Sequence, residues 1–513
     1  MRNCFKVLGV VFIFMFFMGY VNEGQAIMTI DVGEDKYITF GGYLENLSGL
    51  RTSGKYSGKV DAFRSTLHPE FFFKLSKDAS LFMSGHFVKE TSYDMEDHLD
   101  LPDDYYDQTD FEAYEMYLDL NLTSSIKTRV GRQFVVWGET DIFRLMDIVN
   151  PQDSSWVCPG IMPMEDTRIP NWMLTMTKRL SFRSSLELVY VPMLDDEDQR
   201  VNKGAPSGGR WRARSFQGGN VFSHLPNMAA DYGAAAAGGA TLDMSSFGVS
   251  AVPEKKLDES RIGGRFRSTI GGFELALAAF WGHDYSPVFQ YNGFTIETRS
   301  ELVDDGSGNA AYVDNDYFVP DVSLEHNRQA TFGFCFNYYD SNLTEGVWRG
   351  EFAFLPDKHY QTIDPAVTTA VTERDTFMYA LGFDKEITMG PLHPDNPSVP
   401  FFISFQIFQT FIFDHDDDLQ FVLYDTPMEE MDTTFTGVIN TTYLNGSWKP
   451  EVAVVYNTEG YGMVRPKLIF YPQWDENIYI ALYYINFFGD DQYQGFGLYD
   501  KLDTVFLQLR YMW

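Results

Sequence analysis

The chain is 513 residues long and strongly acidic, with 39 Lys and Arg against 72 Asp and Glu and a formal net charge of −33. Such a charge disfavours nucleic acid as a partner. Aromatic residues make up 16% of the chain although the mean hydropathy is only −0.23, a combination that is unusual for a soluble domain and typical of a membrane barrel with aromatic girdles and a polar inner wall.

The first 26 residues are predicted to form a secretory signal peptide. Arg2 and Lys6 precede the apolar run VLGVVFIFMFFMGYV, and small residues follow at 24–26, the order that Sec signals have. The alternative, a retained anchor helix, is disfavoured because the run is shorter than the roughly 20 residues that a span needs. Cys4 precedes the apolar run and is therefore not the lipidated cysteine of a lipoprotein. We expect residues 1–26 to be removed and residues 27–513 to form the exported protein.

Period-two alternation dominates the rest of the chain. In YEMYLDL (114–120), Tyr114, Met116 and Leu118 share one face and Glu115 and Asp119 lie on the other. Because one face suits lipid and the other suits water, this pattern predicts the wall of a transmembrane barrel. No segment after residue 26 has 18 consecutive apolar residues, which excludes helical spans.

The pattern predicts an all-β transmembrane antiparallel barrel of about 18 strands, within a range of 16–18. The expected strands are 37–49, 61–75, 80–90, 110–121, 126–137, 171–180, 184–193, 259–270, 273–282, 324–338, 346–356, 374–386, 399–413, 433–444, 449–457, 463–472, 476–487 and 503–513. Short links alternate with long ones, as periplasmic turns alternate with outer loops. The links 387–398 and 458–462 fit this alternation least well.

The link 138–170 is predicted to fold into the lumen as a plug or constriction. Its segment TDIFRLMDIVN (140–150) has apolar residues at helical spacing, with Pro151 at its end, and predicts a short helix. In the preceding strand, Arg132 falls on the lipid side, where it costs roughly 2–4 kcal/mol at mid-bilayer. We therefore expect a bulge at Gly131 that turns Arg132 inward.

The polar residues around this link are candidates for a network that pins the plug to the wall, because buried charges are tolerated when they are paired. They are Arg132, Trp137, Glu139, Asp141, Arg144, Asp147, Asn150 and Asp153. Two roles remain open for them, structural bracing and direct ligand contact or gating.

The longest outer loop is predicted at 194–258. Its part 220–253 is rich in Ala and Gly and nearly uncharged, so it either folds into the mouth, as a plug or an apolar surface, or is a disordered small-residue loop. Acidic runs at 96–104, 194–199, 414–418 and 429–432 fall in outer loops. They suit solvated loops, cation bridges to lipopolysaccharide or a negative vestibule.

The C-terminal strand, with Tyr511 and the final Trp513, is similar to the signal that outer-membrane barrels present to the barrel-assembly machinery. After removal of the signal peptide two cysteines remain, Cys158 and Cys335, for which one disulfide is compatible with an oxidising compartment and two free thiols are the favoured interpretation.

Signatures of catalysis are missing from the sequence. It contains no HExxH, CxxC or GxSxG motif, so no catalytic residue, metal or cofactor is assigned. A Ser/His or Asp/His pair on the inner wall would escape this search, and an outer-membrane barrel enzyme therefore stays as the third interpretation.

The run VGRQFVVWGETDIFRLMDIVNPQD (130–153) and EDTRIPNWML (165–174) resemble a Gram-negative family of large outer-membrane barrels defined only as a domain of unknown function. The blocks 261–290 and 348–361 are similar to it as well. The resemblance implies partnership with an RND/MMPL-type exporter and a lipoprotein-sorting-like periplasmic carrier, because such barrels are often encoded beside them.

The leading interpretation is an outer-membrane channel or conduit for hydrophobic or lipid-like compounds, in contact with membrane lipid and lipopolysaccharide. A diffusive porin for small polar or cationic solutes is the alternative, in which opposed charges set up a field across the pore.

Overall fold

The computed structural model describes residues 28–96, 109–140, 143–153, 167–194, 225–243, 249–304, 310–394, 396–421, 426–489 and 495–513. The expected signal peptide, Asp141 and Cys158 lie outside these ranges. Among the described residues, no helix is both long and apolar enough to cross a membrane.

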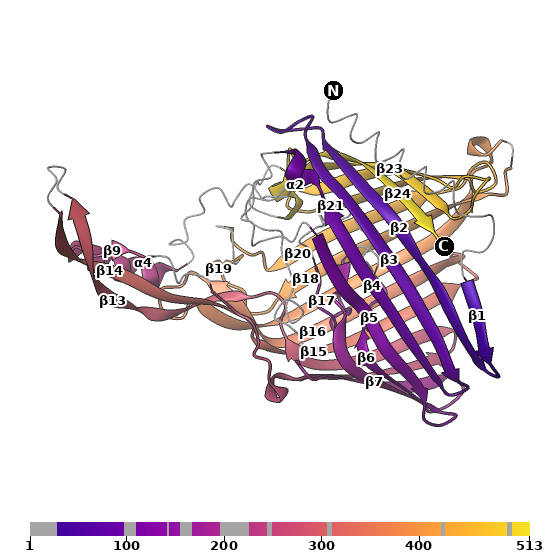
Figure 1. The fold of residues 1–513 in the computed structure, drawn as a ribbon, viewed down its shortest axis with the longest axis horizontal. Coiled ribbons are helices and arrows are strands. Elements are labelled where there is room, and N and C mark those ends of the chain that lie inside the picture. The colour runs from indigo at the N-terminus through magenta and orange to yellow at the C-terminus, as the bar shows by residue number, and fades with distance from the viewer. Residues whose placement is uncertain are drawn as a thin grey trace.

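Eighteen antiparallel strands form a closed barrel, in which each strand pairs with the next along the chain and β24 pairs with β2 (Figure 1). The strands are β2 (Lys36–Arg51), β3 (Val60–Ser76), β4 (Ala79–Glu90), β5 (Thr109–Asn121), β6 (Ile126–Gln133), β7 (Asn171–Arg179), β8 (Ser184–Val191), β11 (Arg261–Ile270), β12 (Phe273–His283), β15 (Arg328–Asp340), β16 (Gly346–Thr362), β17 (Val371–Thr388), β18 (Pro400–Ile412), β20 (Met431–Asn440), β21 (Trp448–Asn457), β22 (Gly462–Phe470), β23 (Ile478–Phe488) and β24 (Thr504–Met512).

The alternation seen in the sequence separates the two faces of this wall. On β23, Leu482 is 51% exposed on the outside, whereas Tyr483 and Ile485 are buried on the inside. Aromatic rings stack between neighbouring strands on the outer face, as for Phe273 and Tyr338, whose ring centroids lie 4.2 Å apart. The outer face is therefore apolar, as a barrel wall in lipid requires.

The predicted fold class is confirmed, and each of the 18 expected strands overlaps one strand of the barrel. Several boundaries were wrong. The strand expected at 346–356 extends to Thr362, and the strand expected at 433–444 ends at Asn440. The strand expected at 126–137 ends at Gln133. The strand expected from residue 324 begins at Arg328, because residues up to Glu325 belong to another strand, β14 (Ala310–Glu325).

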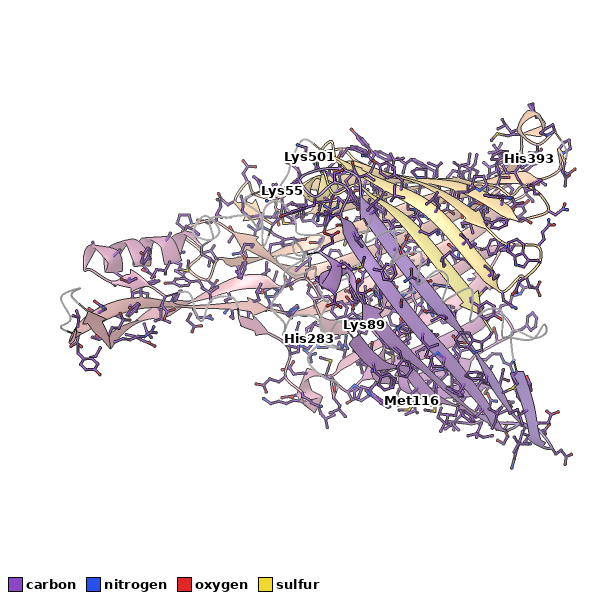
Figure 2. The ribbon with its side chains drawn as sticks, turned by 45° about the horizontal axis from the view of Figure 1, so that its top comes forward. Lys55, Lys89, Met116, His283, His393 and Lys501 are labelled. Atoms are coloured by element: carbon purple, nitrogen blue, oxygen red, sulfur yellow. The ribbon has the colours of Figure 1, made fainter. Side chains whose placement is uncertain are left out.

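The two ends of the barrel differ in their connections. One end carries short turns such as 122–125 and 271–272, and the other carries the long links. The link between β17 and β18 contains the 3-10 turn η6 (Gly390–Leu392). His393 lies in this link, at the end of the barrel remote from the long links (Figure 2), so the link is an extended turn at the short-turn end.

A second sheet projects from the barrel on the long-link side (Figure 1). It consists of the hairpin β13 (Val288–Asp304) and β14 (Ala310–Glu325), joined by β9 (Thr241–Leu242) and β10 (Val249–Ala251). The helix α4 (Pro226–Ala237) packs on it, with Leu225 and Met228 fully buried. The described residues 225–243 thus cover this sheet, so for them neither the plug nor the disordered loop expected within 220–253 is correct.

The remaining short elements are β1, which pairs with β2, β19, which pairs with β16, and the helical turns α2, η5 and η7. Their bounds are β1 (Met28–Gly33), β19 (Leu419–Gln420), α2 (Ser92–Met95), η5 (Leu257–Glu259) and η7 (Gly495–Tyr499).

The last residues close the barrel. Tyr511 pairs with Leu44 of β2, and the backbone groups of Trp513 and Gly42 exchange two hydrogen bonds of 3.1 Å. The Trp513 ring lies 6.3 Å from that of Phe40. The C-terminal residues therefore form part of the seam between the first and last barrel strands.

Candidate functional site

The link between β6 and β7 leaves the wall and enters the barrel; its described residues, 134–140, 143–153 and 167–170, are called the inward loop below. Met146 is fully buried against Cys335, Ala353 and Ala380, which belong to three different wall strands. A Cβ at Gly333 would overlap the Met146 side chain. The loop thus crosses the lumen from β6 and β7 to the wall formed by β15, β16 and β17.

Asn150 holds the two ends of the loop together. Its Oδ1 accepts a hydrogen bond from the backbone nitrogen of Val135 at 2.9 Å, and its Nδ2 donates to the carbonyl oxygens of Gln133 at 3.2 Å and Ile169 at 2.9 Å. Since Asn150 is fully buried, these bonds replace the ladder bonds that β6 and β7 stop making at this point.

Asp147 is the centre of the charged contacts within the loop. Its Oδ2 lies 2.7 Å from Nε of Arg168 and 3.3 Å from Nε of Arg144. Arg144 also donates to the carbonyl oxygens of Asp147 and Asn150. Burial lowers the pKa of Arg144, and the Asp147 carboxylate opposes this shift. Two guanidinium groups around one buried carboxylate make this a brace for the loop backbone.

Glu351 on β16 anchors the loop to the opposite wall. Its side chain is buried, and it accepts hydrogen bonds from the backbone nitrogens of Glu139 and Met146, the latter at 3.0 Å. Its neighbour Arg349 donates to the carbonyl oxygen of Glu139 at 2.7 Å and pairs with Asp384 at 2.8 Å. The wall therefore satisfies backbone groups that no secondary structure satisfies here.

Trp137 fixes the start of the loop. It is 1% exposed, and its ring meets Phe280 at a centroid distance of 6.0 Å. Arg265 lies 5.7 Å from the Trp137 ring, donates to the carbonyl oxygen of Val136 at 3.0 Å and pairs with Glu187 at 2.8 Å.

Phe143 connects the loop to a different part of the lumen. Its ring lies 5.3 Å from Phe408 on β18 and 6.3 Å from Phe496 in η7. Phe496 belongs to a buried apolar cluster on the inner face of β21–β24, called the apolar wall below. Its main wall residues are Val455, Met463, Ile469, Ala481, Tyr483, Ile485, Phe487 and Phe506.

Arg132 turns away from lipid, as predicted, but by a different device. Gly131 has a φ of 137°, and a Cβ there would overlap the carbonyl oxygen of Met116. The β5–β6 and β6–β7 ladders keep their register through Gly131, so the expected bulge is absent from them. Arg132 is buried and forms an ion pair with Glu112 of β5.

The structure brings together part of the predicted network. Arg144, Asp147 and Asn150 form one hydrogen-bonded group. Arg132 of β6 donates to the carbonyl oxygen of Pro170 at 3.2 Å, Trp137 packs on the wall, and Glu139 contributes backbone groups. Asp153 donates its backbone nitrogen to the carbonyl oxygen of Thr167 at 2.7 Å. Asp141 lies outside the described residues.

The helix expected at 140–150 is wrong for residues 143–150, which form bends and irregular backbone. Sequence reasoning also missed Arg168 within the loop and the wall partners of the loop, Arg265, Arg349 and Glu351. The block WRGEFAFLPDKHYQ (348–361) contains two of these and was singled out only for its family resemblance. A charged pair on an otherwise aromatic strand was the signal that would have found them.

The side of the lumen away from the apolar wall is polar. Cross-strand ion pairs line it, including Arg129 with Asp119 at 2.7 Å. Two open cavities of about 410 and 450 Å³ lie on this side, near the short turns. Within the described ranges, no three His, Cys, Asp or Glu side chains gather at metal-binding distance.

Three solved structures are similar to the barrel. OmpF of Salmonella typhi, in a complex with daunomycin, is 10% identical with a TM-score of 0.40, covering 95% of this chain and 100% of its own. OpdK of Pseudomonas aeruginosa with vanillate is 8% identical with a TM-score of 0.48, covering 93% and 98%. OccAB1 of Acinetobacter baumannii is 8% identical with a TM-score of 0.49, covering 96% and 99%. Similarities at this level do not indicate a shared substrate.

None of the curated proteins matches the chain. The family model described as "Protein of unknown function (DUF1302)" matches residues 53–512. This range covers most of the chain and includes the inward loop, the block 348–361 and nearly all of the barrel. The resemblance that the motif around residues 130–153 indicated is therefore confirmed, and the chain belongs to the DUF1302 family.

Proposed function

We propose that this protein is an outer-membrane channel for hydrophobic or amphipathic compounds, and that the inward loop closes its conduit. The observation that carries the proposal is the contact of Phe143 with the apolar wall. A loop that crosses the lumen and packs on an apolar inner surface blocks the route along that surface.

The closed barrel and its apolar outer face support placement in an outer membrane. The short-turn end then faces the periplasm and the projecting sheet faces outward. The signal peptide expected at 1–26, and the terminal Tyr511 and Trp513, support export followed by insertion through the barrel-assembly machinery. Membrane lipid and lipopolysaccharide are the partners of the outer face.

The apolar wall favours a hydrophobic cargo. The inner wall of a water-filled barrel is polar, yet here the inward positions of β23 are Ala481, Tyr483, Ile485 and Phe487. Apolar surface facing a lumen gains free energy when it contacts an apolar molecule, at roughly 25 cal/mol per Å² removed from water. A polar solute gains nothing from it.

The contacts of the loop suit a gate that is closed at rest. The loop is held by a few polar anchors, the Asn150 amide, the Asp147 group and Glu351. Loss of one anchor leaves buried groups unpaired, at about 1–3 kcal/mol each. For the predicted network residues, bracing is the main role and gating follows from it.

Single-channel recording in planar bilayers tests the proposal. The wild-type protein is expected to be nearly silent, and deletion of 138–165 or the substitution Glu351→Ala is expected to raise conductance. The point variant keeps the whole loop, so it tests the proposal independently of any misfolding of the deletion variant. A large, steady, cation-selective ohmic current through the wild-type barrel would refute the closed conduit.

A diffusive porin for small polar or cationic solutes is the second candidate. The ion pairs and the two cavities on the polar side of the lumen favour it. The same recordings decide between the two, because a porin conducts ions without any change to the loop. A barrel enzyme, the third interpretation, would need a Ser/His or Asp/His pair within hydrogen-bond reach on the inner wall.

The family resemblance adds an inner-membrane exporter of the RND/MMPL type and a periplasmic carrier as proposed partners. A strain that lacks the protein tests this part of the proposal. We expect this strain to have an altered sensitivity to bile salts and other hydrophobic compounds. We expect the same change in a strain that lacks the exporter encoded beside the barrel. Unchanged sensitivity in both strains would contradict the proposed partnership.

A further inference from the structure

We propose that the periplasmic mouth of the lumen contains a binding site for amphipathic anions, in which Lys449 and Lys467 take the charged headgroup. The site rests on the proposed function, for which it names the class of cargo. Both lysines project from the inner faces of adjacent strands, Lys449 at the start of β21 and Lys467 near the end of β22. These strand ends join the short turns.

Neither lysine is neutralised by a carboxylate. Among the described residues, no carboxylate oxygen lies within 4.0 Å of the Nζ of either side chain. The neighbouring carboxylates are already used, since Glu451 pairs with Arg465 at 3.0 Å and Glu45 with Arg510 at 2.6 Å. The two lysines and the two arginines therefore share two carboxylate partners, Glu451 and Glu45. This local excess of positive charge occurs in a chain whose net charge is −33.

Tyrosine rings surround the Lys467 ammonium. Its Nζ lies 5.4 Å from the ring centroid of Tyr483 and 5.7 Å from that of Tyr479. Ring faces attract a cation without forming the ion pair that a carboxylate would form, so the hydrogen-bond donors of the ammonium stay available for a ligand. A third ring, Tyr471, meets Tyr479 edge-on at 5.6 Å.

The same tyrosines lead to apolar surface. Tyr471 and Tyr479 are partly buried and pack against the apolar wall, in which Ile469 and Ala481 pair across β22 and β23. Phe143 of the inward loop packs against the same cluster. A headgroup held by the lysines thus places an attached apolar chain on the tyrosines and directs it towards the gate.

This arrangement selects for two features at once. The uncompensated lysines disfavour a cationic headgroup, and the apolar wall adds nothing to the affinity for a small polar anion. The ligand class is therefore a carboxylate or phosphate joined to an apolar body. The two headgroups share the chemistry that the lysines recognise, and separate probes distinguish them.

Calorimetric titration of the full exported chain in zwitterionic lipid nanodiscs tests the site, with empty nanodiscs to subtract partitioning into lipid. The probes are octanoate, octyl phosphate, octyltrimethylammonium and acetate. We expect saturable binding of octanoate or octyl phosphate, and at least tenfold weaker binding of octyltrimethylammonium and acetate. Whichever anion binds more tightly identifies the preferred headgroup.

Lys467→Gln is expected to weaken binding of the preferred anion about tenfold, and Lys467→Arg to retain it. Lys127→Gln is the matched control, because Lys127 also lies on an inner face, that of β6, away from the tyrosines. Equal binding of octanoate and octyltrimethylammonium would overturn the site, as would wild-type affinity in Lys467→Gln or an equal loss in Lys127→Gln. A negative result in this binding experiment leaves the conductance test of the gate unaffected. Failure of the binding site can therefore be distinguished from failure of the proposed function.

Discussion

The backbone nitrogen of Met146 lies 3.0 Å from Oε2 of Glu351, although 205 positions separate the two residues in the sequence. This hydrogen bond joins the middle of the inward loop to the wall strand β16. Because Glu351 is 1% exposed and also accepts the backbone nitrogen of Glu139, one carboxylate fixes two points of the loop.

Glu351→Ala should therefore release the loop from this wall. It removes the acceptor for two backbone donors, which costs about 1–3 kcal/mol for each donor left buried. We expect higher single-channel conductance from a barrel that still assembles, as judged by heat-modifiable migration on gels. Glu274→Ala is the control, since Glu274 lines the cavity near the short turns. Equal conductance in wild type and Glu351→Ala would show that Glu351 does not anchor the loop.

Arg144→Ala should weaken the brace within the loop. The guanidinium group contacts the Asp147 carboxylate and donates to the carbonyl oxygens of Asp147 and Asn150. Without it, Asp147 keeps only Arg168 as a charged partner among the contacts described above. We expect increased conductance and faster antibiotic entry into cells with unchanged barrel levels. Arg179→Ala, which removes a guanidinium at the end of β7 that donates to Ser124 of a short turn, should change neither.

The barrel could be predicted from the sequence because each strand carries its own signal. Alternation between lipid and lumen is local, and so is the contrast between short and long links. The end of β6 could not be located this way. The alternation continues through Val135 to Trp137. The backbone nitrogen of Val135, however, donates its hydrogen bond to Oδ1 of Asn150, and the chain leaves the wall at this point.

The inward loop was predictable as a site but not in its conformation. Helical spacing at 142–149 suggested a helix, in which backbone groups bond to one another. The wall and loop side chains bond those groups instead, as Glu351 does for Met146 and Arg144 does for Asn150. Such tertiary contacts override local propensity, and a partner 205 positions away leaves no local pattern. The protruding hairpin β13–β14 was missed because its strands were assigned to a link.

Gly131→Ala should destabilise the base of the loop. A Cβ at this position would overlap the carbonyl oxygen of Met116, and the φ of 137° is unfavourable for any other residue. Strain of this kind costs about 1–3 kcal/mol. We expect a lower urea midpoint for unfolding in detergent micelles. Gly437→Ala is the control, because a Cβ there comes no closer than 4.0 Å to its nearest neighbour; equal midpoints for the two variants would contradict the steric argument.

Asn150→Ala should open the two ends of the loop. It removes three hydrogen bonds of a fully buried amide, to Val135, Gln133 and Ile169. A loss of about 1.4 kcal/mol corresponds to tenfold faster hydrogen exchange, and we expect at least this change at the Val135 amide by mass spectrometry. Asn457→Ala removes an equally buried amide on β21. It should leave exchange at Val135 unchanged, and acceleration by both variants would indicate a general loss of stability.

Deletion of Trp513 should impair assembly rather than gating. The two 3.1 Å backbone hydrogen bonds between Trp513 and Gly42 lie at the seam between β24 and β2, which forms last if the strands are added in chain order. We expect less folded barrel in the membrane and more degradation, while the barrels that do form conduct like wild type. Trp474→Ala serves as the control, because Trp474 is 74% exposed in the turn between β22 and β23. Normal barrel levels after deletion of Trp513, or an equal loss with Trp474→Ala, would show that the terminal residue carries no assembly signal.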